Sequence, residues 1–125
     1  MFSYRRFAWA IFAMAGLNSV AAADEFADPG RRIFQRHCQT CHGGTGQADS
    51  PIGPDLTGII GRKAGAGDSG VHSRLAVESG IVWTRSSLRR YLQDPGREMP
   101  GTLMPVQVSD PRELDDLLNY LESLR

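Results

Sequence analysis

The most regular pattern of apolar and polar positions lies at the C-terminal end of the chain. Asp110 precedes it as an N-cap, Pro111 suits the first helical position, and Glu113 is placed to complete a capping box. Leucines then recur every three or four residues, which aligns them along one side of an α-helix: Leu114, Leu117, Leu118, Leu121 and Leu124. The sequence therefore predicts a helix that begins just after Asp110.

A second helix is predicted near the start of the chain. Asp28 serves as its N-cap and Pro29 stands at the first helical position, and the helix runs on into residues 38–42. Its inward side consists of Gly30, Ile33, Phe34 and His37. Because a glycine inside a helix costs stability, Gly30 indicates a close crossing with another helix.

A third amphipathic helix is capped by Thr84 and ended by the Asp-Pro-Gly sequence at residues 94–96. Its buried stripe consists of Leu88, Tyr91 and Leu92. A shorter helix is predicted over residues 75–78, between a cap at Ser73 and a stop at Gly80.

No stretch alternates apolar and polar residues convincingly, so we expect an all-α domain with about four to five short helices. Irregular segments are predicted over residues 43–51, 64–70 and 96–108, and a short turn or helix over residues 57–61. Loops of this length are unusual in a small domain. They are explained if they pack against a bound apolar group rather than against one another.

The apolar residues that we expect in the core are spread over the whole domain. They are Phe26, Ile33, Phe34, Leu56, Ile59, Ile60, Leu75, Val77, Ile81, Val82, Trp83, Leu88, Tyr91, Leu92, Leu114, Leu117, Leu118, Tyr120, Leu121 and Leu124. This is a modest core, and a buried apolar group would enlarge it. We therefore expect the chain to be poorly folded without that group.

The first 23 residues differ from the rest. Arg5 and Arg6 precede an apolar run over residues 7–17, and three alanines at residues 21–23 form a small-residue cleavage site. The sequence predicts a cleavable secretory signal peptide over residues 1–23 and a single domain over residues 24–125. The alternative is an N-terminal anchor that is not cleaved.

The charge of the exported domain limits its partners. Removing Arg5 and Arg6 from the 14 lysines and arginines leaves 12 against 14 aspartates and glutamates. This mildly acidic balance provides neither the basic face that nucleic acid requires nor a polybasic membrane patch. Lys63 is the only lysine in the sequence, so a cationic docking surface would have to consist of arginines.

The chemistry of the chain centres on residues 38–42, Cys-Gln-Thr-Cys-His. Two cysteines three positions apart, followed directly by a histidine, are the pattern of covalent haem attachment. The thiols of Cys38 and Cys41 would bond the two vinyl groups of a haem, and His42 would follow the helical turn to face the iron. With the export signal, the motif predicts a haem protein of the bacterial periplasm.

Three other interpretations of the cysteine pair fit less well. A thioredoxin-like dithiol needs a preceding strand, and none is predicted. A structural zinc site needs a second pair of ligands, and His37 and His72 stand in no paired motif. A disulfide between positions so close in sequence would constrain almost nothing.

A second axial ligand has to come from the other side of the haem. His37 is held on the same side as His42 and cannot reach. His72 lies in a glycine-rich loop and could face a haem edge, whereas Met99 and Met104 share the loop before the last helix. A thioether on a flexible chain suits a low-spin haem and raises its potential.

Together these features resemble the class I c-type cytochromes, including mitochondrial cytochrome c and its bacterial periplasmic relatives. The resemblance extends over essentially the whole exported domain. It rests on residues 38–42, 53–58, 61–65, 80–83, 88–92 and 100–104. The last of these segments is the most specific, because the attachment motif is shared by many unrelated cytochromes.

The resemblance implies a role for individual residues. Cys38 and Cys41 would form thioether bonds to one haem c, and His42 and Met104 would be the axial ligands of its iron. Met99 would then belong to the core or serve as a backup ligand. The carbonyl of Pro54 would accept the second imidazole N–H of His42 and fix its tautomer. In the pocket, Arg62 and Trp83 would meet a propionate, and Tyr91 and Thr102 would lie near Met104.

The sequence also departs from the family pattern. His72 stands where mitochondrial sequences have a tyrosine that contacts a propionate, Ala76 replaces an asparagine near the haem, and Asp55 replaces another asparagine. The ring of lysines around the exposed haem edge is missing. Electrostatic docking onto an acidic partner is therefore not implied for this chain.

The resemblance implies a soluble periplasmic one-electron carrier rather than an enzyme. Its redox protein partners would be membrane oxidoreductase complexes or periplasmic dehydrogenases and oxidases, bound transiently. We expect a monomer with no nucleic acid, no small-molecule substrate, and no membrane contact unless the signal is kept. The alternatives are a dedicated electron-accepting subunit of one dehydrogenase or oxidase, a haem peroxidase or gas sensor with an open sixth position and, more remotely, a zinc-binding adaptor.

Overall fold

The computed structural model describes residues 28–44, 52–66 and 74–125. It has the helices α1 (Pro29–His37), α2 (Gln39–His42), α3 (Arg74–Ser79), α4 (Arg85–Gln93), α5 (Pro95–Glu98) and α6 (Pro111–Ser123). These described segments contain no strand, only an isolated antiparallel bridge between Lys63 and Val82. The prediction of an all-α domain with long loops is confirmed. The proposed signal peptide, Phe26, His72 and Ser73 lie outside the described residues.

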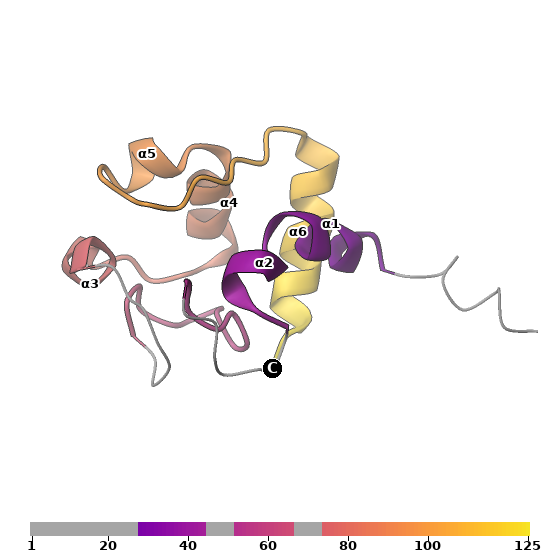
Figure 1. The fold of residues 1–125 in the computed structure, drawn as a ribbon, viewed down its shortest axis with the longest axis horizontal. Helices are drawn as coiled ribbons and strands as arrows, with labels where there is room; N and C mark the ends of the chain where they lie inside the picture. The colour runs from indigo at the N-terminus through magenta and orange to yellow at the C-terminus, as the bar shows by residue number, and fades with distance from the viewer. Residues whose placement is uncertain (1–27, 45–51, 67–73) are drawn as a thin grey trace, which may run out of the picture.

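The crossing of α1 and α6 is the most extensive contact between helices (Figure 1). A β-carbon added to Gly30 would lie 2.1 Å from the backbone oxygen of Asp116, so only a glycine lets the two backbones approach this closely. Next to this point the rings of Phe34 and Tyr120 pack with their centroids 5.3 Å apart. The close crossing predicted from Gly30 is therefore present, and α6 is the partner helix.

The leucines of α6 form the centre of the core. Leu114, Leu117 and Leu118 are completely buried, and Leu121 is nearly so. α4 packs against both α6 and α5. Burying this stripe of leucines, at about 1.5–3 kcal/mol for each side chain, is the main reason that α6 is stable.

The attachment motif does not continue α1 as a single helix. The N–H of Cys38 donates to the carbonyl of Phe34, and Cys38 then separates α1 from the short helix α2. The expectation that one helix runs through residues 38–42 is therefore wrong in this detail.

A second difference concerns the segment that we expected to be irregular after α4. α5 begins at Pro95, and the side chain of Asp94 accepts a hydrogen bond from the N–H of Arg97. An aspartate cap followed by a proline is the same signal that correctly predicted the starts of α1 and α6. The signal was present in the sequence but was interpreted only as the end of α4.

The capping box predicted at the start of α6 is not found there, although the N-cap residue is the predicted one. Asp110 caps α6 by accepting from the N–H groups of Arg112 and Glu113, as expected. The carboxylate of Glu113 lies 3.6 Å from the guanidinium of Arg36 on α1. The reciprocal capping box is found at α4 instead, between Thr84 and its third helical residue, Ser87.

Four residues predicted for the core are exposed: Ile60, Leu75, Val77 and Val82. Two of them lie on α3, which contacts no other helix of the described chain. Because α3 packs only against loops and the cavity edge, just Ala76 of its apolar side chains lies against the core, and it is partly buried.

Candidate haem site

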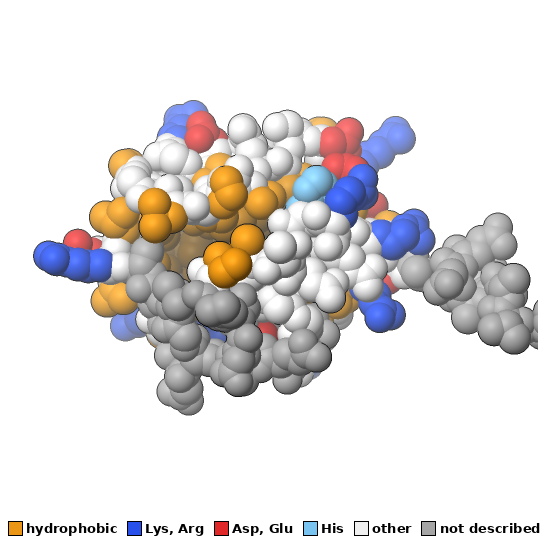
Figure 2. All heavy atoms as spheres, in the orientation of Figure 1, with side chains coloured by type: hydrophobic (Ala, Val, Ile, Leu, Met, Phe, Trp, Pro, Cys, Tyr) orange, Lys and Arg blue, Asp and Glu red, His pale blue; other side chains and the backbone are white. Residues whose placement is uncertain are grey.

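A cavity of about 360 Å³ opens on the face shown in Figure 2, where hydrophobic side chains surround a hollow. Its wall is formed mainly by α2, α4, the segment after α2 and the loop between α5 and α6. Single residues of α1, α3 and α6, namely His37, Ala76 and Leu121, and the loop residues Gly65 and Trp83 complete it. Among the described residues that line it, none is an aspartate, glutamate, lysine or arginine. The volume is in the range of small-molecule and cofactor sites, about 300–1,000 Å³, and the wall is suited to a large apolar group.

The structure brings together all but one of the site residues predicted from the sequence. Those that line the cavity are Cys38, Cys41, His42, Pro54, Trp83, Tyr91, Thr102 and Met104. Arg62 is not among the lining residues. These positions come from four separate parts of the chain, which makes a chance convergence implausible.

The imidazole of His42 is fixed by its surroundings. Its Nδ1 lies 2.7 Å from the carbonyl oxygen of Pro54, so Nδ1 carries the proton and Nε2 remains available for a metal. A β-carbon on Gly53 would lie 2.9 Å from the same Nδ1, so this glycine leaves room for the ring. Burial lowers the pKa of His42, although the Pro54 hydrogen bond and the charge of Asp55 oppose the shift. Burial thus favours the neutral imidazole, which is the form that binds metals.

The two cysteines lie on the cavity wall, and neither takes part in a disulfide. Burial, reinforced by Cys41, raises the pKa of Cys38 to about 11. The N–H groups of Cys41 and His42 both donate to the carbonyl of Cys38, at 3.1 and 2.9 Å. This tight turn presents both sulfur atoms and the imidazole to one cavity.

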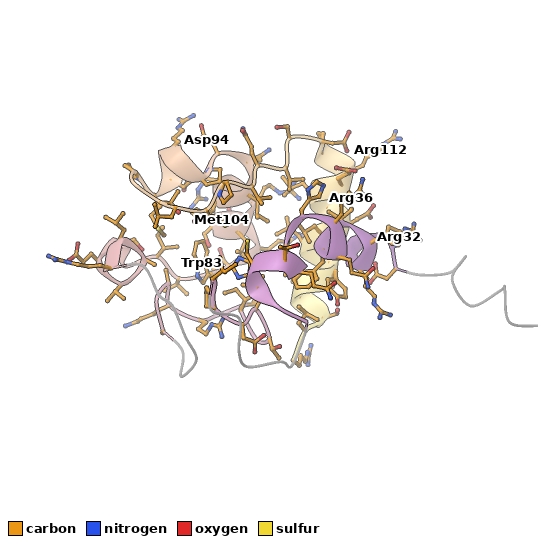
Figure 3. All side chains as sticks on the ribbon, in the orientation of Figure 1. Arg32, Arg36, Trp83, Asp94, Met104 and Arg112 are labelled. Carbon is orange, nitrogen blue, oxygen red and sulfur yellow. The ribbon has the colours of Figure 1, made fainter. Side chains whose placement is uncertain are left out.

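Met104 comes from the loop between α5 and α6 (Figure 3). Its backbone N–H donates to Thr102 Oγ1 at 3.3 Å, and Thr102 Oγ1 lies 2.8 Å from the hydroxyl of Tyr91 on α4. This chain of hydrogen bonds ties the loop to a helix that is packed on the core. Met99 also lines the cavity and is buried, in agreement with its assignment to the core.

Trp83 and Arg62 occupy different positions with respect to the cavity. Trp83 is part of the wall, and its ring packs against that of Tyr91 with centroids 5.0 Å apart. The guanidinium of Arg62 donates to the carbonyls of Asp55, at 2.6 Å, and Thr57, at 3.3 Å. Arg62 therefore holds the turn that follows Pro54, and its backbone oxygen accepts a hydrogen bond from the N–H of Trp83.

The donor set fits a covalently attached haem. Two thiols, a neutral imidazole with a fixed tautomer and a thioether meet in one apolar cavity. The sequence reasoning did not identify the steric role of Gly53, although its place directly before Pro54 was a usable signal. Leu56 and Ile59, predicted for the core, also line the cavity, whereas Val106 was not identified, because it lies in a loop where helical periodicity gives no signal.

Comparisons with known proteins show which family the chain belongs to. The family model for cytochrome c matches residues 27–125. The chain belongs to the cytochrome c family. It is 33% identical to cytochrome c2 of Blastochloris viridis over 119 residues, which are 94% of this chain and 92% of the relative. It is 40% identical to cytochrome c2 of Agrobacterium tumefaciens over 97 residues, 74% of this chain and 86% of the relative.

A solved structure agrees with this assignment. Cytochrome cH from Methylobacterium extorquens superposes with a TM-score of 0.69 at 35% identity, covering 76% of this chain and 95% of the other. The protein is thus a c-type cytochrome that carries haem c covalently and transfers electrons, and it is not an enzyme. The described part of the chain holds no cluster of three or more His, Cys, Asp or Glu residues that could bind a metal ion. No helix within it is long and apolar enough to cross a membrane.

Proposed function

We propose that this cytochrome c is a soluble one-electron carrier of the bacterial periplasm with His42 and Met104 as axial ligands. The observation that supports it best is the convergence of an imidazole and a thioether, from separate elements, on the cavity that also holds the two thiols. When bound, the haem supplies reversible one-electron chemistry at its iron. His42 and Met104 would together hold the iron, which would leave no position on it for a substrate.

The chain's own residues orient and shield the group. Cys38 and Cys41 would attach it, and the Pro54 carbonyl sets the tautomer and basicity of His42. The hydroxyls of Tyr91 and Thr102 hold the backbone of Met104 in place. The apolar wall excludes water from the site, which tunes the potential.

The pocket residues Trp83 and Arg62 are assigned to the propionate side. Trp83 lies in the wall, and the Arg62 guanidinium is fixed to the carbonyls of Asp55 and Thr57 at the adjacent turn. The positive charge of Arg62 at this turn would compensate the negative charge of a haem propionate.

Carbon monoxide binding tests the ligand assignment against a peroxidase or gas sensor. The ferrous wild-type protein is expected to bind carbon monoxide poorly, because Met104 occupies the sixth position. Met104→Ala is expected to bind it readily. Rapid binding by the wild type would show that the sixth position is open and would overturn the carrier assignment.

Location is supported by the N-terminal sequence, with its two arginines, apolar run and alanine cleavage site. The protein purified from a bacterial periplasmic fraction is expected to begin near Asp24, as read by mass spectrometry of the intact chain. Recovery of the full-length chain from membranes would indicate an uncleaved anchor. Stoichiometric co-purification with one dehydrogenase or oxidase would favour the dedicated subunit instead of a free carrier.

A further inference from the structure

The mouth of the haem cavity is bordered by apolar side chains that are exposed to solvent. We call Ile52, Leu75, Val77, Leu103 and Pro105 the apolar rim. Ile52 and Leu103, which line the cavity, are 60% and 89% exposed, and Pro105 beside them is exposed too. The hydrophobic atoms around the hollow are visible in Figure 2.

The two members of the rim on α3 are continuous with the cavity. A β-carbon on Gly65, a wall residue, would lie 2.5 Å from Cγ2 of Val77. A β-carbon on Gly101 would lie 2.9 Å from Cδ1 of Leu75. α3 is thus packed on the cavity edge although it contacts no other described helix, and Val77 remains 59% exposed.

The described residues of the cavity wall include no charged side chain. On α3, Arg74 Nε donates to Glu78 Oε1 at 2.7 Å, so the pair adds no net charge to the rim. Arg32, Arg36 and Arg112 lie at the other end of the molecule, where α1 meets α6 (Figure 3). Among the described residues, the cavity wall and the apolar rim therefore carry no charge.

We propose that the apolar rim is the surface on which the redox partner docks, and that the partner presents an uncharged, apolar face around its own redox centre. The proposal rests on the proposed carrier function. Electron transfer falls off steeply with distance, so a partner has to approach the side on which the cavity opens. A charged partner face gains no ion pair there, whereas an apolar face removes Leu103, Ile52 and Val77 from water.

The size of the rim determines the kind of complex. The rim consists of five apolar side chains, and apolar patches on monomers, in general about 300–600 Å² at their largest, are often functional. An interface centred on it falls below the roughly 1,200 Å² of stable complexes, so docking is transient. Release after each electron is what a carrier requires.

The test uses voltammetry of the full haem protein on gold electrodes coated with either methyl-terminated or carboxylate-terminated alkanethiols. The methyl surface represents an apolar partner and the carboxylate surface an acidic one. The wild type is expected to give a direct redox signal on the methyl surface, and this signal should change less than about twofold between about 10 mM and 500 mM salt. It should give a weaker signal on the carboxylate surface.

Leu103→Asp is expected to reduce the signal on the methyl surface about tenfold, since it removes a leucine from the contact. Val77→Asp, at a rim position outside the cavity wall, should reduce it too and keeps the test decisive if Leu103→Asp disturbs the site. Ile60→Asp, which changes an exposed isoleucine outside the rim, is the matched control and should leave the signal unchanged.

A signal that is strongest on the carboxylate surface and lost at high salt would overturn the proposal, because arginines would then guide docking. Equal signals from the wild type and both rim variants would overturn it as well. Small soluble mediators separate this proposal from the carrier function. A protein that reacts with mediators but with neither surface refutes docking at the rim, whereas one that does not react with mediators refutes the carrier function and the docking proposal with it.

Discussion

Gly30→Ala tests the crossing of α1 and α6. The added β-carbon would lie 2.1 Å from the Asp116 oxygen and 2.6 Å from Tyr120 Cβ, well inside normal contact distances. Because both contacts are on α6 near its backbone, the helices have to separate by about 1 Å or more. Overpacking of this kind costs about 1–3 kcal/mol, and the better helix propensity of alanine returns at most about 1 kcal/mol. We expect a net loss of about 2 kcal/mol.

Thermal unfolding of the haem protein, followed by circular dichroism, measures this loss. For a domain of about 100 residues, about 2 kcal/mol corresponds to a decrease in Tm of roughly 8–16 °C. Gly96→Ala is the matched control, since its β-carbon would meet no atom nearer than 4.0 Å and its φ is not positive. A Gly30→Ala protein as stable as the wild type, or an equal loss in Gly96→Ala, would refute the reasoning.

Three further predictions concern other parts of the structure. Tyr91→Phe removes the hydrogen bond to Thr102, so we expect a loss of about 1 kcal/mol in thermal unfolding; an unchanged Tm would contradict the proposed tie. The pKa of the exposed Asp115 lies below its ordinary value of 3.8, chiefly because of the Arg89 hydrogen bond. The ionised Asp115 therefore stabilises the fold fully above its ordinary pKa, and this contribution is lost as the pH falls through the lowered pKa of the folded protein. Asp115→Asn should thus flatten the acid limb of a profile of Tm against pH. An unchanged acid limb would contradict the role of the Arg89–Asp115 pair. The double variant Cys38→Ala/Cys41→Ala should lose covalent haem and, after haem extraction, most of its helical circular dichroism, because the apolar cavity wall would then face water and the remaining core is modest; a native spectrum without haem would show that the core suffices.

Local signals in the sequence predicted most of the fold. The caps at Asp28, Thr84 and Asp110 and the leucine periodicity of α6 were sufficient, because these elements are stabilised by their own first turns and by one apolar stripe. The exposure of Leu75 and Val77 was not predictable in this way. Their burial would require a second helix against α3, and no local pattern shows that α3 contacts no other helix of the described segments.

The residues of the site differ in how well the sequence alone predicted them. The spacing of Cys38, Cys41 and His42 is imposed by the haem itself, so it could be read directly. The Pro54 contact and the position of Met104 came from the family resemblance, and the structure places both residues at the cavity. The hydrogen bonds of Arg62 to two backbone carbonyls could not be predicted, because they depend on how a loop folds back on itself.

The most direct test of the central claim is the optical spectrum of the ferric protein, in the far-red band that reports a bond between iron and a methionine sulfur. Met99 and Met104 both line the cavity, so Met99→Leu is the matched control for Met104→Leu. The account predicts that the wild type and Met99→Leu show the band and that Met104→Leu loses it. Absence of the band in the wild type, or its loss in Met99→Leu but not in Met104→Leu, would contradict the assignment of His42 and Met104 as the axial pair.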